Sequence, residues 1–378
     1  MKKFIALTVI LVFMSLLVIP ISAESGGRGG IYPSEEMDEL FDILPENVEK
    51  ELVEFRTAET DTDRLSAVRD KLDVKYWMTY LIDLLADYLL PGITSCTPLL
   101  CLIVVSAILK KYLSEGSCAD VGNFTVSVIT GVTVCNVTVC YVNTAVGFIS
   151  RISAIMTAML PVMNAILLTS GELTSAGVSS AGLMLYVTAA EKVTETVLVP
   201  LSGVLLSLCT VTGVFHGVNI SSLVSGIRKV LMTLMSFSLL IYSFVMGIQS
   251  SLAKSADSLS MKTVRFAVGT YVPIVGGALS DALATVTAGL TVIKRFTGSV
   301  GIIIILLTVL PTVISLFIGR LSLLVCKTVA ETVECDSAAS IIGDAESVLS
   351  LFLAFSVLTG MFFIFATVLF MNSGVGYF

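Results

Sequence analysis

One acidic residue stands inside an otherwise uncharged apolar stretch, and it is the first candidate for chemistry in this chain. Asp281 follows the run Val275–Ser280, and no basic residue lies nearer to it than Lys294. A charged carboxylate at the centre of a bilayer costs about 2.5–3.5 kcal/mol, so Asp281 is expected to face protein or water. Two interpretations stay open: an ion- or proton-linked or pore-lining acid, or a protonated or water-facing acid near a helix break.

Most enzyme classes are excluded because the residues or motifs that they require are missing. His216 is the only histidine, which excludes an H-E-x-x-H zinc site, and no G-x-x-x-x-G-K-[ST] phosphate loop occurs. The sequence Gly343-Asp344 follows Ile341-Ile342, so the Gly-x-Gly-Asp motif of intramembrane aspartyl proteases is missing. We therefore predict a protein that is not an enzyme, without catalytic residues, cofactor or metal.

Prolines inside apolar stretches are the second candidate feature. A proline removes a backbone donor and kinks a helix. Paired broken helices in two repeats are typical of transporters, which bind substrate at the repeat interface. Membrane helices also tolerate proline without any such role. The predicted helix breaks are Pro161, Pro200, Pro273 and Pro311.

Small residues recur every four positions around Asp281, at Gly276, Ser280, Ala284 and Ala288. Such a stripe lets another helix backbone approach closely. The stripe is predicted to pack within the chain or to support oligomerisation.

The composition indicates the elements that must position these residues. Of 378 residues, 55% are hydrophobic and only 13% are charged, against about 25% charged in soluble domains. Polar and apolar residues do not alternate as in membrane strands, so an all-α polytopic membrane protein is predicted. The net charge of −7 comes from residues 24–76, with 15 acidic and 7 basic residues. This balance makes nucleic acid an unexpected partner.

The first 23 residues have the pattern of a secretory signal peptide. Lys2 and Lys3 precede an apolar run of about 16 residues, which is short for a span of about 20. Cleavage is predicted between Ala23 and Glu24, which places residues 24–80 outside the cytoplasm as an acidic amphipathic segment. A helix is expected from Glu46 to Phe55, and aromatic residues from Tyr76 to Tyr88 fit a membrane interface. The alternative is an uncleaved first membrane helix.

Residues 81–378 form the predicted multi-pass domain, with six to eight spans. Lys110-Lys111 closes the first span, as expected on the cytoplasmic side. The region from Ile152 to Ala190 fits either two short spans or a re-entrant pair. The apolar stretches are Tyr88–Leu109, Val121–Ser150, Ile152–Gly171, Leu173–Ala190, Thr196–Ile227, Val230–Ala253, Phe266–Ile293 (interrupted by Asp281), Phe296–Gly319 and Ser347–Phe378.

An internal duplication is suggested by the proline spacing. The interval from Pro161 to Pro273 is 112 residues, and that from Pro200 to Pro311 is 111. Residues 220–246 also align without gaps with residues 338–364, with seven identities in 27 positions. The predicted repeats are residues 152–250 and 265–371.

The whole pattern resembles the stage III sporulation protein AE family of endospore-forming Firmicutes. The resemblance rests on the signal peptide, on the acidic lead from Leu65 to Tyr88, and on Leu90-Pro91-Gly92 ahead of the first span. It continues through Lys110-Lys111, Met159-Leu160-Pro161 and the connector Ser340-Ile341-Ile342-Gly343-Asp344. It carries no catalytic residue.

The resemblance implies a role in sporulation. Members are made in the mother cell and join the other stage III sporulation A proteins in the membrane around the forespore. That assembly meets stage II sporulation protein Q from the forespore side and forms a channel or secretion complex. The complex keeps the forespore viable and supports late gene expression under sigma factor G, and a companion ATPase, protein AA, would supply the energy. An autonomous secondary transporter that uses the proline-broken helices and Asp281 is the alternative.

Overall fold

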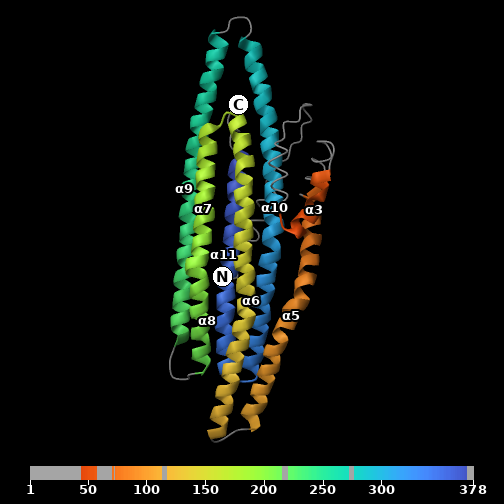
Figure 1. Ribbon diagram of the computed structural model, residues 1–378, viewed down its shortest axis with the longest axis vertical. Helices are drawn as coiled ribbons and strands as arrows, with labels where there is room; N and C mark the ends of the chain where they lie inside the picture. The colour runs from red at the N-terminus through yellow and green to blue at the C-terminus, as the bar shows by residue number, and fades with distance from the viewer. Residues whose placement is uncertain are drawn as a thin grey trace.

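The computed structural model describes residues 44–57, 70–71, 73–112, 117–214, 220–271 and 276–372 (Figure 1). These residues form helices and the short turns between them, and no strand occurs among them. The prediction of an all-α membrane protein is confirmed. The elements are α3 (Glu46–Thr57), α5 (Val74–Tyr112), α6 (Ser117–Thr169), α7 (Leu173–Val193), the π-helix η1 (Thr194–Leu198), α8 (Val199–Val214), α9 (Ile220–Tyr271), α10 (Gly276–Thr332) and α11 (Asp336–Asn372).

The long helices run up and down in an elongated antiparallel bundle. Helices α5, α7, α8 and α10 run in one direction and α6, α9 and α11 in the other (Figure 1). The α9–α10 hairpin extends past its neighbours at one end of the bundle, and the α5–α6 pair does so at the opposite end (Figure 1). Five helical segments are long and apolar enough to cross a membrane within the described part of the chain. They are Lys75–Leu109, Phe124–Thr169, Leu173–Leu208, Gly289–Thr332 and Asp336–Asn372.

Several helices are longer than the apolar stretches suggested. Helix α6 has 53 residues, which is about 80 Å at 1.5 Å per residue, while the hydrocarbon core of a bilayer is about 30 Å thick. Helix α6 contains the stretch Val121–Ser150 and the stretch that begins at Ile152 as far as Thr169, so the expectation of two separate spans is wrong. The stretch Phe266–Ile293 is divided instead, because α9 ends at Tyr271 and α10 begins at Gly276.

The count of six to eight spans stays a prediction. The stretch from Val230 to Ala253 lies in α9, where many side chains are outside the description. The repeats 152–250 and 265–371 also stay a prediction, although the two aligned segments lie in α9 and α11. The cleavage site at Ala23 and Glu24 falls outside the described residues.

The prolines do not act alike. Contrary to the expected breaks, α6 and α10 continue through Pro161 and Pro311. Pro200 is the second residue after the π-helix η1 and lies in the first turn of α8. A proline ring clashes with the carbonyl four residues back, and a wider π turn moves that carbonyl away. Pro273 lies outside the described residues.

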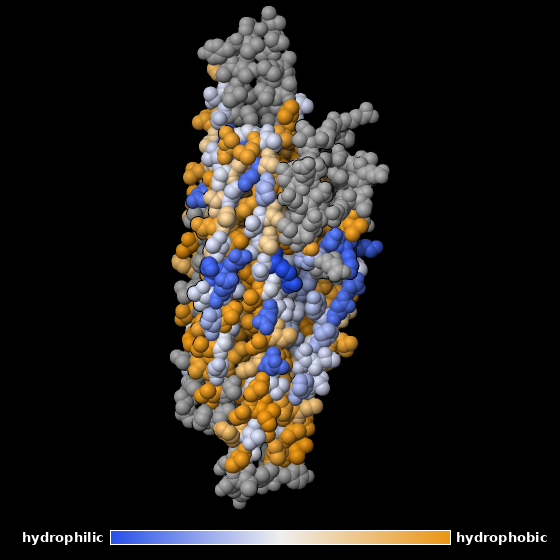
Figure 2. Space-filling model, in the orientation of Figure 1, coloured by the Kyte–Doolittle hydropathy of each residue, from blue (hydrophilic) through white to orange (hydrophobic). Residues whose placement is uncertain are grey.

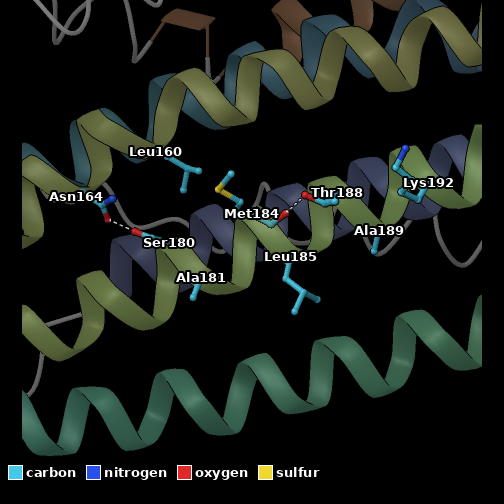
Figure 3. A pocket seen from close by; sticks show the side chains of 9 residues that line it. All are labelled: Leu160, Asn164, Ser180, Ala181, Met184, Leu185, Thr188, Ala189 and Lys192. Atoms are coloured by element: carbon cyan, nitrogen blue, oxygen red, sulfur yellow. Dashed lines mark hydrogen bonds between the residues drawn. The ribbon is translucent and has the colours of Figure 1, made fainter.

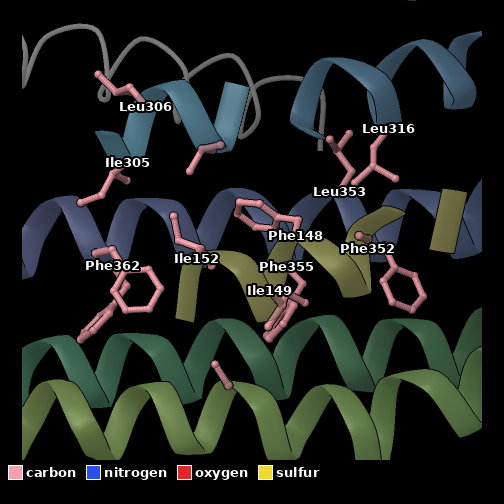
Figure 4. Packing of buried hydrophobic residues seen from close by; sticks show 14 of the residues in the cluster. Phe148, Ile149, Ile152, Ile305, Leu306, Leu316, Phe352, Leu353, Phe355 and Phe362 are labelled. Carbon is pink, nitrogen blue, oxygen red and sulfur yellow. The ribbon is translucent and has the colours of Figure 1, made fainter. Parts of the chain in front are cut away.

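The core is built around the α10–α11 hairpin, against which α6 packs. The side chains of Phe148, Ile152, Ile305 and Phe352 are fully buried there (Figure 4). On the next helix the ring of Tyr186 stacks on Phe362 with a centroid distance of 3.5 Å. Glycines allow the helices to approach closely, because a Cβ on Gly360 would meet a methyl of Val309 at 2.8 Å.

Many large apolar side chains are exposed along the described helices. Figure 2 shows apolar residues over the α5–α6 end of the visible face, with hydrophilic residues gathered at mid-height and over the α3 end of α5. An apolar exterior fits lipid contact over much of the bundle.

Candidate functional site

The turn between α6 and α7 is set by a glycine. Gly171 has a φ of 76°, in the left-handed region that glycine occupies without a steric penalty. The backbone N–H of Gly171 donates to Leu168 O, and that of Glu172 donates to Leu167 O. This pair of bonds is the Schellman motif, which ends α6 and satisfies its last carbonyls. The turn therefore places the next residue, Glu172, at the start of α7.

Glu172 forms a buried ion pair with a residue 122 positions later in the chain. Lys294 Nζ on α10 donates to Glu172 Oε1, and each side chain is only 2% exposed. The second carboxylate oxygen, Glu172 Oε2, has no hydrogen-bond partner among the described residues. Removing one partner of such a pair costs about 3–5 kcal/mol, because the other charge stays buried.

A third helix caps α7. Asp257 on α9 accepts hydrogen bonds from the backbone N–H of Thr174 at 3.0 Å and of Ser175 at 2.7 Å. These N–H groups have no partner inside α7, and an acidic side chain at a helix N-terminus also interacts favourably with the helix dipole. Burial raises the pKa of Asp257, but the hydrogen bonds from Ser175 and Thr174 outweigh it, so the pKa is lowered. Asp257 is thus held as a carboxylate.

A fourth helix joins the same end of the bundle. Lys254, one turn before Asp257 on α9, donates from Nζ to the carbonyl oxygen of Asn372 at 2.5 Å. Asn372 is the last residue of α11. We call Glu172, Asp257, Lys294 and Lys254 the polar network; it ties α7, α9, α10 and α11 together next to the α6–α7 turn.

A second ion pair lies further along the α10–α11 hairpin. Arg320 Nε donates to Glu346 Oε1 at 2.5 Å, and the two side chains are 22% and 13% exposed. Arg320 follows Lys294 by 26 residues, or about 39 Å of helix. The uncharged stretch Phe296–Gly319 lies between these two charged levels.

A groove runs along the outside of the α6–α7 hairpin. Its volume is about 720 Å³. Helix α6 contributes Leu160 and Asn164, and α7 contributes seven residues between Ser180 and Lys192. Met184 and Leu160 extend into the space between the two helices, and the Ser180 hydroxyl donates to Asn164 Oδ1 at 2.6 Å (Figure 3). The groove is therefore mainly apolar, with Lys192 at one end.

The N-terminal segment packs on the α5 end of the bundle. Helix α3 confirms the helix expected from Glu46, and its Glu51 accepts hydrogen bonds from Lys71 at 2.9 Å and from the Tyr76 hydroxyl at 2.5 Å. Burial raises the pKa of Glu51, but these hydrogen bonds outweigh it and lower the pKa. Trp77, 4% exposed, and Tyr80 extend the cluster on the α5 side.

The structure does not show that the residues predicted from the sequence to be functional form one site. Asp281 and the stripe Gly276, Ser280, Ala284 and Ala288 lie at the start of α10, before Gly289–Thr332, and their side chains are outside the description. The roles of Asp281 and of the stripe stay predictions.

Sequence reasoning missed the polar network. In the sequence, Glu172 only separates the apolar stretches that end at Gly171 and begin at Leu173, and Lys294 only follows the stretch that ends at Ile293. A usable signal was present, because each is a charged residue next to long uncharged runs, and such charges are expected to find partners.

Comparison with known proteins identifies relatives. The family described as Stage III sporulation protein AE matches residues 58–373 of this chain. The Stage III sporulation protein AE of Bacillus subtilis (strain 168) is 23% identical over 347 residues, which cover 90% of this chain and 84% of that protein. No solved structure gives a significant match.

Proposed function

Because the chain belongs to the stage III sporulation protein AE family, we propose that it is a membrane subunit, without enzymatic activity, of the channel or secretion complex between mother cell and forespore. The match over residues 58–373 carries this proposal. It is supported by five helical segments able to cross a membrane. The proposed location is the mother-cell membrane around the forespore, with the N-terminal segment outside the cytoplasm.

The proposed partners are the other stage III sporulation A proteins, and indirectly stage II sporulation protein Q and a companion ATPase. Residues 24–80 are the proposed docking surface. The contact of Glu51 with Lys71 and Tyr76 supports this role, because it holds α3 against the start of α5 and so would present a fixed surface to a partner.

The test is a mild-detergent pull-down of the tagged full-length protein from sporulating cells. The partner proteins should be retained by the wild type and lost when residues 24–57 are deleted. The deletion variant must still be found in the membrane fraction, so that loss of partners is not loss of the protein. Failure of the wild type to retain any sporulation protein would contradict the proposal.

A secondary transporter is the second candidate. The buried Glu172–Lys294 pair favours it, because ionisable residues within membrane helices often mark ion pathways. Reconstitution of the purified protein alone in proteoliposomes tests it. Solute or proton movement that Asp281→Asn abolishes would support the transporter, and the absence of any movement would exclude it.

A further inference from the structure

The groove on the α6–α7 hairpin lies within a segment of bilayer length. Arg151 precedes the last residue of α6 by 18 positions, and Lys192 follows the first residue of α7 by 19. Both therefore lie about 27–29 Å from the turn at 1.5 Å per residue, and the sequence between them and Glu172 holds one charged residue, Glu191, next to Lys192. This length matches the hydrocarbon core of about 30 Å. The level of Arg151 and Lys192 is thus suited to one membrane–water interface.

The walls of the groove are apolar and open outward. Met184 is 61% exposed and Leu185 is 60% exposed. Ala181 and Ala189 lie on the same helix and leave room that larger side chains would fill. From Ser180 to Lys192 the groove follows about 18 Å of helix, slightly more than half of a bilayer core.

The hydroxyl groups in the wall are used inside the protein. The Ser180 hydroxyl donates to Asn164 Oδ1, and the Thr188 hydroxyl donates to the carbonyl oxygen of Met184 at 2.8 Å. Hydrogen bonds between helices are one main source of helix association in membranes. With these donors already engaged, the wall suits a hydrocarbon chain better than a partner helix.

The charged end of the groove carries both signs. Lys192 Nζ lies 3.4 Å from Glu195 Oε2, and the two side chains are 71% and 68% exposed. An ammonium group beside a carboxylate complements a head group that contains both a phosphate and an ammonium.

We propose that the α6–α7 groove binds a zwitterionic phospholipid, with one acyl chain along Leu160, Ala181 and Met184 and the head group at Lys192 and Glu195. The phosphate pairs with Lys192, and the lipid ammonium pairs with Glu195. The bound lipid fills the space that the alanines leave, and so completes the outer surface of the hairpin.

The test uses the purified full-length protein in detergent with phosphatidylethanolamine that carries a photoreactive diazirine in its acyl chain. Cross-linked peptides are identified by mass spectrometry, and labelling of the groove is divided by labelling at the exposed Leu90 of α5. In the wild type this ratio should be well above one. The variant Ala181→Phe/Ala189→Phe should lower it about tenfold, because two phenyl rings occupy the chain's volume.

The matched control is Val197→Phe/Val204→Phe, which places the same side chains at positions 39% and 50% exposed beyond the groove. This control should leave the ratio unchanged, and it also shows whether added aromatic residues disturb folding. A ratio near one in the wild type, or an equal loss in the control, would mean ordinary annular lipid and overturn the proposal.

Head-group selectivity gives a second, independent readout. Glu195→Gln should raise the ratio of phosphatidylglycerol to phosphatidylethanolamine bound in native mass spectrometry by about two- to fivefold, the range expected for an exposed charge pair. An unchanged ratio would contradict the head-group assignment. Photoreactive groups placed at Ala181 that capture a polypeptide instead of lipid in native membranes would overturn the proposal in favour of a partner helix.

Discussion

Helices α5 and α10 are both apolar enough to cross a membrane, yet they have opposite surroundings. In the most apolar window of α10, 83% of the residues are buried, and in α11 the share is 72%; in α5 it is only 22%. Helix α10 carries Gly298, Gly301 and Gly319, each approached by a side chain of another helix, whereas Leu90 and Ile93 of α5 are 69% and 56% exposed. A high hydropathy therefore shows that a helix favours leaving water. It does not show whether lipid or protein then covers its side chains.

The largest expected effect is at the charged end of the core hairpin. Lys294→Met should destabilise the protein by about 3–5 kcal/mol, because Glu172 stays buried without its ammonium partner. The measurement is denaturant-induced unfolding in detergent. Lys327→Met is the matched control on the same helix, since its pair with Glu331 is 3.7 Å long and 38% and 56% exposed, and it should cost about 0–1 kcal/mol. Equal losses in both variants would show that the network is not a special feature of the core.

Large-to-small changes test the difference between the two regions directly. Phe352→Ala on α11 removes a fully buried ring and should cost about 3 kcal/mol through the cavity it leaves. Leu90→Ala on α5 removes a mostly exposed side chain and should change stability by less than about 0.5 kcal/mol. Both are measured by the same unfolding experiment. A cost for Leu90→Ala as large as that for Phe352→Ala would mean that α5 is covered by protein in the purified state.

Close packing inside the hairpin predicts a smaller loss. Gly360→Ala should destabilise by about 1–3 kcal/mol, because the new Cβ meets a branched and buried Val309. Gly203→Ala on α8 has no atom within 4 Å of the new Cβ; it should be neutral or stabilising, since alanine is the better helix former. Thermal unfolding midpoints compare the two variants. A stabilising Gly360→Ala would show that α10 and α11 can separate without cost.

The smallest predicted effect concerns the cap of α7 and depends on pH. The folded-state pKa of Asp257 is lowered, so its contribution is present above the ordinary aspartate value of about 3.9 and is lost as pH falls through the folded value. Asp257→Asn should cost about 1 kcal/mol at pH 7 and should flatten the loss of stability below about pH 4. Unfolding midpoints at pH 7 and pH 3.5 measure both. An unchanged acid profile in Asp257→Asn would contradict this assignment.

Local features were predictable, and contacts across the chain were not. The helix at Glu46 and the apolar helical segments follow from composition and short-range spacing. The helix breaks expected at Pro161 and Pro311 are absent, because α6 and α10 continue through these prolines. A helix embedded among other helices can lose one hydrogen bond and still be favoured by the packing around it.

The sequence by itself determined the class of the protein, the location of its apolar segments and the family to which it belongs. Each of these depends on residues close together in the chain or on the sum of all residues. Only the tertiary structure decided that Glu172 and Lys294 meet across 122 residues, that α10 is enclosed while α5 is exposed, and that α6 and α7 form a groove. The physical reason is that pairing and enclosure depend on which helix faces are brought together, and hydropathy along one helix is the same for either outcome.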